Sequence, residues 1–490
     1  MWMTPEQMSL PRSTPAQQGV HAQRVIDFVD GVKAADLELH SLMIVRHGHV
    51  IAEGFWQPYA AQLPHMLFSL SKSFTSTAVG LAIAEGRLAL DDLVLSFFSD
   101  EVPKDISTNL AAMRVRDLLT MSTGHQEEPR LRQGATDENW VRAFFAATVE
   151  YAPGTHFVYN SGATYILSAI VQKVTGQDLL AYLEPRLFAP LGIVGATWER
   201  SPQGVCAGGW GLNIRTEDIA KFGQLYLQQG EWEGQRLIPS SWIAQATDKQ
   251  IANDVGKSED ECENSDWAQG YGYQFWRCRH GAYRGDGAFG QFCIVMPAQD
   301  MVIAITSGVR DMQAVLAQVW THLLPACEAA VLDADAMVTQ TLAQKLAGLT
   351  LNPPRYGVPG HERTISGRTY RMQEASSRIH TISFSFHETG LRMTVANERG
   401  EHVVECGRES WVKGTTSLLG SVQAKVAASA SWQDEHTCEV TCRFYETPFT
   451  MRLVCTFDED EVVVRESINV SFGPTEYPPL RGSSRITAER

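Results

Sequence analysis

The sequence predicts a two-domain protein of the α/β (α+β) class. An antiparallel sheet flanked by helices carries a helical lobe and is followed by a small all-β barrel or sandwich. Two observations predict this order. In the longer N-terminal part of the 490 residues, stretches with helical periodicity surround strand-like pairs. Beyond a proline- and glycine-rich stretch at 350–362, the pattern changes to the two-residue alternation of strands.

The N-terminal elements are a helix and a hairpin. Residues 21–35 carry a single apolar stripe, which predicts an amphipathic helix. The β-rich runs 41–46 and 49–54 are joined by His47-Gly48, which indicates a hairpin with a tight turn.

A central helix is predicted from Ser69 to about Glu85, with Gly86 placed to end it. The body of this helix is apolar nearly all round, as in a helix at the centre of a domain. Such a helix has little reason to carry Lys72 at its start unless a cleft opens there. This favours a functional role for Lys72.

The remaining elements of the first domain are helices and a second hairpin. We expect further helices at 114–121, 137–149, 161–175, 216–229 and 311–324, and strands at 271–276, 290–296 and 301–307.

The second domain is predicted to be all-β, with strands at 382–386, 391–395, 438–444 and 451–457. We place the first domain at 1–335, a linker at 336–362 and the all-β domain at 363–490. No nucleophile-base pair is evident in the last of these, so we expect a supporting or lid role.

Charge and composition exclude several classes of function. A net charge of -15 disfavours nucleic acid and anionic membranes as partners. No apolar run approaches the length of a membrane span, and the N-terminus has no basic region followed by an apolar stretch. We therefore expect a cytoplasmic protein that neither crosses nor binds a membrane.

The nine cysteines are odd in number and scattered, which indicates reduced thiols. Cys438 and Cys442 lie on the apolar face of a predicted strand, so we interpret them as core residues. Gly285-Asp-Gly-Ala-Phe-Gly has the spacing of a dinucleotide-binding loop, but a strand follows it where a helix is required. We expect no metal and no cofactor.

The chemistry concentrates on Ser69-Leu-Ser-Lys72. In a helix, positions three apart share one face, so a hydroxyl lies beside an amine at a helix start. Serine becomes a nucleophile when a neighbouring base takes its proton, and lysine is such a base when its pKa is lowered. By itself the tetrapeptide is weak, since chance supplies about one Ser-x-x-Lys in a chain of this length.

Three motifs in order carry a resemblance. Phe68-Ser-Leu-Ser-Lys-Ser-Phe-Thr, the stretch 115–124 and Tyr159-Asn-Ser161 are similar to the serine β-lactamase/penicillin-binding-protein superfamily. The most similar members are class C β-lactamases and related esterases, D-aminopeptidases and 6-aminohexanoate-dimer hydrolases. The resemblance spans about 20–325 and implies a β-lactamase-like fold.

The resemblance also implies a mechanism. Ser69 attacks a carbonyl carbon to form an acyl-enzyme, and Lys72 and Tyr159 move protons. Tyr159 in this role needs Lys72⁺ nearby to lower its pKa. The oxyanion hole combines the backbone N–H of Ser69 with one near Ala288.

Substrate-binding candidates lie around these residues. Gly287 and Ala288 fall at the predicted strand edge. Ser161 caps the next helix, and whether it also lines the site is left open. The third motif departs from the superfamily, because Gly285-Asp286-Gly287 stands where a lysine or histidine is usual; His280 or Arg284 could reach the same space. We interpret Asp286 as a turn residue. The missing basic residue argues against β-lactam and D-Ala-D-Ala recognition.

The leading hypothesis is a serine hydrolase that cleaves a small ester or amide through an acyl-serine intermediate. Alternatives are a D-amino-acid peptidase or amidase, a β-lactamase, and a non-catalytic scaffold of the same fold. The expected partner is a small ester, amide or short peptide. The oligomeric state stays open, with a homodimer among the possibilities.

Overall fold

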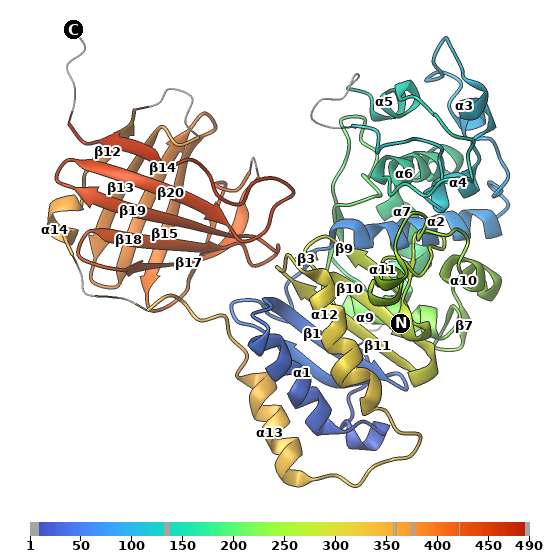
Figure 1. Cartoon of the computed structure of the whole chain (residues 1–490), viewed down its shortest axis with the longest axis horizontal. Helices are drawn as coiled ribbons and strands as arrows, with labels where there is room; N and C mark the ends of the chain where they lie inside the picture. The colour runs from blue at the N-terminus through green and yellow to red at the C-terminus, as the bar shows by residue number, and fades with distance from the viewer. Residues whose placement is uncertain are drawn as a thin grey trace. The chain divides into compact units, whose positions relative to one another are not determined.

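The computed structural model describes residues 9–131, 138–355, 357, 360–373, 378–420 and 422–485. The chain forms two compact units. The N-terminal unit comprises Met1–Gly54, Ala61–Ser307 and Asp311–Gly348, and the barrel unit comprises Phe55–Ala60, Gly308–Arg310 and Leu349–Arg490. Both are coloured along the chain in Figure 1.

A six-stranded antiparallel sheet forms the centre of the N-terminal unit within the described residues. Its strand order is β2-β1-β11-β10-β9-β8. In the middle of the sheet, β1 from the beginning of the unit therefore pairs with β11, which is the last strand of the sheet along the chain. The register joins Ile44 to Ile303, and Ile303 to Ile294. The strands are β1 (Leu39–Arg46), β2 (His49–Phe55), β8 (Trp276–Arg277), β9 (Tyr283–Gly287), β10 (Gln291–Met296) and β11 (Met301–Ser307).

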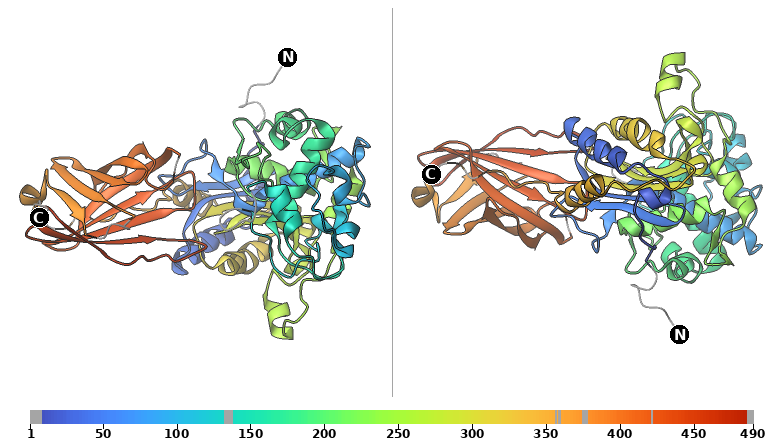
Figure 2. Two further views of the ribbon diagram at one scale, coloured as in Figure 1. Left: turned by 90° about the horizontal axis from the view of Figure 1, so that it is seen from above. Right: turned by 90° about the horizontal axis from the view of Figure 1, so that it is seen from below.

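Helices cover both faces of this sheet. Helix α9 (Thr216–Leu227) packs on β1, β10 and β11, where its Gly223 leaves room for Cys293 and Val302. Helices α1 (Ala22–Ala34), α12 (Met312–Gln318) and α13 (Ala336–Ala347) pack together on the opposite face (Figure 2). Successive strand side chains point to opposite faces, so the sheet is buried on both sides.

The helical lobe is built around α2 (Ser71–Ala84), most of whose residues are buried. Helix α6 (Ser161–Thr175) packs along α2, and Gly176 in left-handed conformation ends it. The surrounding helices are α3 (Thr108–Ala112), α4 (Val115–Leu119), α5 (Trp140–Ala146), α7 (Leu179–Leu183), α8 (Ala189–Leu191), α10 (Ser240–Thr247) and α11 (Glu259–Asn264). Short strands are β3 (His65–Met66), β4 (Thr197–Trp198), β5 (Leu212–Ile214), β6 (Glu231–Trp232) and β7 (Gln235–Arg236).

The barrel unit contains a sheet that closes on itself. In the described part of the chain, nine strands run in the order β15-β14-β13-β12-β21-β20-β19-β18-β17, and the parallel pair β15–β17 closes the ring. Strand β16 adds to β17. The strands are β12 (Thr369–Met372), β13 (Thr381–His387), β14 (Gly390–Asn397), β15 (Gly400–Arg408), β16 (Val412–Thr416), β17 (Ala424–Trp432), β18 (Thr437–Arg443), β19 (Thr450–Asp458), β20 (Glu461–Ile468) and β21 (Leu480–Ser483).

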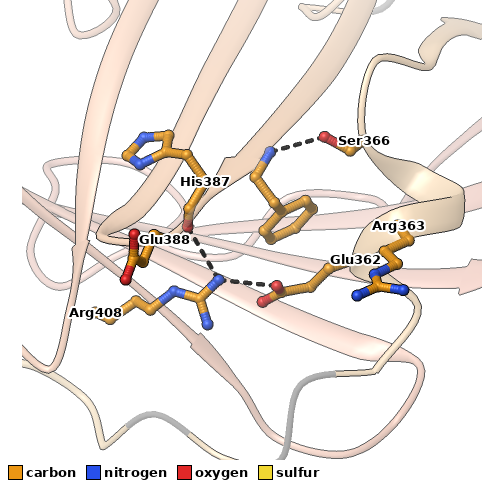
Figure 3. Close-up of a pocket in the computed structure, with 7 residues that line it drawn as sticks. Glu362, Arg363, Ser366, His387, Glu388 and Arg408 are labelled. Carbon is orange, nitrogen blue, oxygen red and sulfur yellow. Dashed lines mark hydrogen bonds and ion pairs between the residues drawn. The ribbon is translucent and has the colours of Figure 1, made fainter.

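The barrel interior is a packed apolar core that includes Cys438 and Cys442, as the alternation predicted. Helix α14 (Glu362–Ile365) borders a pocket of about 440 Å³ (Figure 3). Inside it the Glu362 carboxylate accepts a hydrogen bond of 2.8 Å from Arg408, which also donates to the His387 carbonyl. Glu362 and Arg408 of this pocket are thus paired with each other.

The predicted fold class is confirmed, with a closed barrel as the second domain. Helix 161–175 and the hairpins at 41–54 and 290–307 form as predicted. The predicted helix at 137–149 is shorter, α5, and its residue 137 lies outside the described residues. The sequence around 336–347, expected as linker, forms α13, which packs against α1 and contains the buried Leu342.

The predicted strand at 271–276 is wrong apart from its last residue, which begins β8. Gln274 has a positive φ of 65°, which breaks an extended run. No helix in the described parts of the chain is both long enough and apolar enough to span a bilayer.

Candidate active site

Ser69 lies in a 3-10 turn, Phe68–Leu70, that leads directly into α2. The residue before it, Phe68, has a φ of 48°, an uncommon conformation for a non-glycine residue. Ser69 is partly exposed while Leu70 behind it is fully buried. The turn therefore holds one hydroxyl at the surface of an otherwise buried helix start.

Lys72 follows one helical turn later and its side chain is buried, with 1% exposed. Its Nζ donates to Ser69 Oγ at 2.9 Å, to Ser161 Oγ at 3.2 Å and to the Gly209 carbonyl at 2.7 Å. Three acceptors fix the direction of three N–H bonds, so the amine has one orientation. The predicted Ser69–Lys72 pair is present.

Burial lowers the pKa of Lys72 to about 7, because the charged amine loses hydration that its surroundings do not replace. The negative charges of Glu128 and Asp286 act in the opposite direction. At pH 7 about half of the Lys72 amines are then neutral, compared with about one in 3,000 at an ordinary pKa of 10.5. A neutral amine accepts a proton.

Tyr159 lies beside this pair. Its ring stacks on Trp276 with centroids 5.4 Å apart, and Lys72 Nζ lies 4.8 Å from its ring centroid. The Ser69 hydroxyl acts to lower the pKa of the Tyr159 phenol. Burial, together with Asp286, raises the pKa of Tyr159, so the expected lowering by Lys72⁺ does not dominate. Tyr159 is therefore protonated at neutral pH.

Helix α6 begins where the loop carrying Tyr159 ends. Asn160 caps it, because its side-chain oxygen accepts from the Ala163 N–H at 3.0 Å. Ser161 is the first helical residue, and its hydroxyl accepts from Lys72. Asn160 rather than Ser161 therefore makes the cap, and the role of Ser161 in substrate binding stays a prediction.

Strand β9 ends against the Ser69 turn. A Cβ atom on Gly287 would lie 1.9 Å from the Leu67 carbonyl oxygen, so only glycine permits this approach. Ala288 follows at the turn between β9 and β10, and the ring of Phe289 packs edge-on against Phe68 at 5.3 Å. Gly287 and Ala288 thus border the nucleophile turn.

The third motif differs from its prediction. Asp286 is a buried strand residue, not a turn residue, and Arg284 two positions earlier lies on the same strand face. Their side chains form an ion pair of 2.9 Å, which Arg284 supplements with a bond to the Asp266 carbonyl. His280 lies in a separate 3-10 turn and packs on Trp320. Neither basic residue replaces the usual lysine or histidine as a free cation.

The sequence analysis did not identify two residues that contact the candidate site. Gly209 supplies a carbonyl to Lys72, and a Cβ there would lie 2.9 Å from the Ser161 carbonyl oxygen. Glu128 is an exposed loop residue whose Oε1 accepts from the Ser161 N–H at 2.7 Å. Both lie far from Ser69 along the chain and belong to no motif, so only the fold identifies them.

The chain is similar to several known proteins. The 6-aminohexanoate-dimer hydrolase of Paenarthrobacter ureafaciens is 25% identical over 292 residues, which cover 55% of this chain and 73% of that protein. The D-aminopeptidase of Brucella anthropi is 28% identical over 163 residues, and the chain spans only 31% of its length. The fold is similar to EstCE1, a hydrolase with promiscuous acyltransferase activity (TM-score 0.51, 17% identity, 61% of this chain and 99% of that one).

The family itself follows from the longest match. The Beta-lactamase family model matches residues 31–319, more than half of the chain, and this range contains every residue of the candidate site. The resemblance seen in the three sequence motifs is confirmed, and the chain belongs to the Beta-lactamase family.

Proposed function

We propose that the protein is a serine hydrolase that cleaves small amides, short peptides or esters through an acyl-Ser69 intermediate. The observation that carries this proposal is the buried Lys72 amine, held 2.9 Å from Ser69 Oγ with its pKa lowered to about 7. A lysine in this state is a general base at neutral pH.

In the proposed acylation, neutral Lys72 takes the proton of Ser69 as Oγ bonds to the substrate carbonyl carbon. The negative charge that develops on the carbonyl oxygen is stabilised by the backbone N–H groups of Ser69 and Ala288. Tyr159, which is protonated, gives its proton to the leaving amine or alcohol, and Lys72⁺ returns one to Tyr159. The C–N or C–O bond then breaks and leaves the acyl-serine ester.

In the proposed deacylation, water attacks the acyl carbon and loses a proton to the Lys72–Tyr159 pair. The carboxylic acid leaves and Ser69 regains its proton, so the cycle needs no further reactant. Ser161 and Gly209 support both steps by holding Lys72 Nζ toward Ser69. Gly287 supports both steps by allowing β9 to approach the turn that carries Ser69.

Amides and short peptides are favoured as substrates by the names of the relatives, a 6-aminohexanoate-dimer hydrolase and a D-aminopeptidase. A D-amino-acid peptidase is therefore the second candidate. β-Lactam hydrolysis is disfavoured, because Arg284 is paired with Asp286 and no free cation replaces the usual basic residue among the described residues around the site.

A fluorophosphonate probe tests the proposal. The intact protein is expected to gain one probe mass, and Ser69→Ala is expected to gain none. Ser73→Ala is the matched control, because Ser73 lies on the same helix turn but donates to the Gln274 carbonyl and is buried. Equal labelling of the Ser69→Ala variant, or no labelling of the wild type, would contradict an activated Ser69.

A further inference from the structure

Glu128 is connected to the Ser69–Lys72 pair through Ser161. Its Oε1 accepts from the N–H of Ser161, whose hydroxyl is bonded to the Lys72 amine that contacts Ser69. Glu128 also acts electrostatically on both Lys72 and Tyr159. A short series of contacts therefore joins this carboxylate to the nucleophile, although it comes from a loop outside every motif.

The charge of Glu128 is not compensated by a neighbouring side chain. Across the residues that the structure describes, no lysine or arginine forms an ion pair with it. Lys72 loses much of its charge at neutral pH, and it makes its hydrogen bonds to neutral oxygens. By contrast, Asp286 is paired with Arg284, and the pocket of the barrel pairs Glu362 with Arg408 (Figure 3).

Glu128 is also available to a ligand. It is exposed, and the Ser161 N–H occupies Oε1, so the carboxylate is held in place while Oε2 faces no protein donor among the described residues. A carboxylate that is held in place by such a bond binds a protonated amine through a charge-assisted hydrogen bond. The same charge repels an anionic substrate group.

We propose that Glu128 is a specificity residue that binds a protonated amino group of the substrate. The inference rests on the proposed function and deepens it: the substrates are amides, peptides or esters that carry an ammonium group near the scissile bond. Substrates with a carboxylate in that place are selected against.

The test uses protection of Ser69 from the fluorophosphonate probe at pH 8.5, where Lys72 is neutral in wild type and variants alike. Butylammonium, butanol and butyrate are compared as protecting ligands, since they match in length and differ in charge. The wild type is expected to be half-protected by butylammonium at a concentration at least fivefold below that of butanol, and butyrate is expected to protect least.

Glu128→Gln is expected to abolish the preference for butylammonium, because it removes the charge and keeps an oxygen that can accept from Ser161. Glu127→Gln is the matched control, an adjacent exposed carboxylate, and is expected to retain the preference. Comparable unfolding temperatures verify that each variant folds.

A turnover assay provides the second readout. Alanine p-nitroanilide, as the D- and L-isomers, is compared with isobutyryl p-nitroanilide, in which a methyl group replaces the ammonium. For amines in the leaving group, 2-(dimethylamino)ethyl butyrate in its protonated form is compared with 3-methylbutyl butyrate. The ratio of kcat/KM between cationic and neutral partners is expected to exceed ten in at least one pair and to fall at least fivefold in Glu128→Gln.

Equal protection by the three ligands, or an unchanged preference in Glu128→Gln, would overturn the role of Glu128 while Ser69 still reacts with the probe. Failure of the wild type to react with the probe at all would instead refute the proposed function. The two failures are therefore distinguishable.

Discussion

The protonation of Lys72 should control the rate of acylation. If neutral Lys72 is the base, kcat/KM follows the neutral fraction and rises with pH through about 7. The pKa of Lys72 is lowered from the ordinary value of 10.5 to about 7, so activity rises as the pH rises through about 7 and falls as the pH falls through it. About one amine in a hundred is neutral at pH 5, which predicts about a hundredfold lower rate there than at pH 9.

The assay is the burst of p-nitrophenol from a p-nitrophenyl ester, measured from pH 5 to 9 with circular dichroism to verify folding. The Lys72→Arg variant is a stricter test of Lys72 as the base, because a guanidinium stays protonated and cannot accept the proton. We expect about 10²–10⁴-fold slower acylation in this variant. A flat profile, or a midpoint near 4 that belongs to a carboxylate, would refute Lys72 as the base.

Three further substitutions separate chemistry from packing. Tyr159→Phe keeps the stacking on Trp276, so we expect kcat about 10²-fold lower with an unchanged unfolding temperature. Gly287→Ala forces a Cβ against Leu67, and we expect a loss of about 1–3 kcal/mol in unfolding free energy, whereas Gly420→Ala, with nothing within 4 Å, costs less. Asp286→Asn leaves Arg284 buried without its counter-charge, so we expect a loss of about 3–5 kcal/mol in the free energy of unfolding, measured with denaturant. The exposed Asp91→Asn is expected to lose under about 1 kcal/mol.

Local signals predicted the elements that local chemistry determines. Helix α6 begins and ends as predicted because Asn160 caps it and Gly176 adopts the left-handed conformation that ends it. The hairpin of β1 and β2 follows from His47 and Gly48, both with positive φ. The contact between Ser69 and Lys72 follows from their spacing of three residues.

Contacts that depend on tertiary pairing could not be predicted. Strand β9 contains Gly285-Asp-Gly, a sequence with low β propensity, and forms because Asp286 pairs with Phe292 of β10. Tyr271 to Phe275 alternates like a strand, yet the Gln274 side chain turns to the carbonyls of Leu118 and Leu119. Glu128 and Gly209 reach the site from loops whose local sequence has no signal for it.

The two buried cations of the site show why only one of them is suited to catalysis. Arg284 is fully buried, but Asp286 lies 2.9 Å away, so its charge is compensated and retained. Lys72 is equally buried, but its three hydrogen-bond partners are the neutral oxygens of Ser69, Ser161 and Gly209. Burial without a bonded counter-charge is what lowers the pKa of an amine to about 7. A carboxylate moved into contact with Lys72 would restore its charge, and the proposed base would be lost although every proposed catalytic residue remained in place.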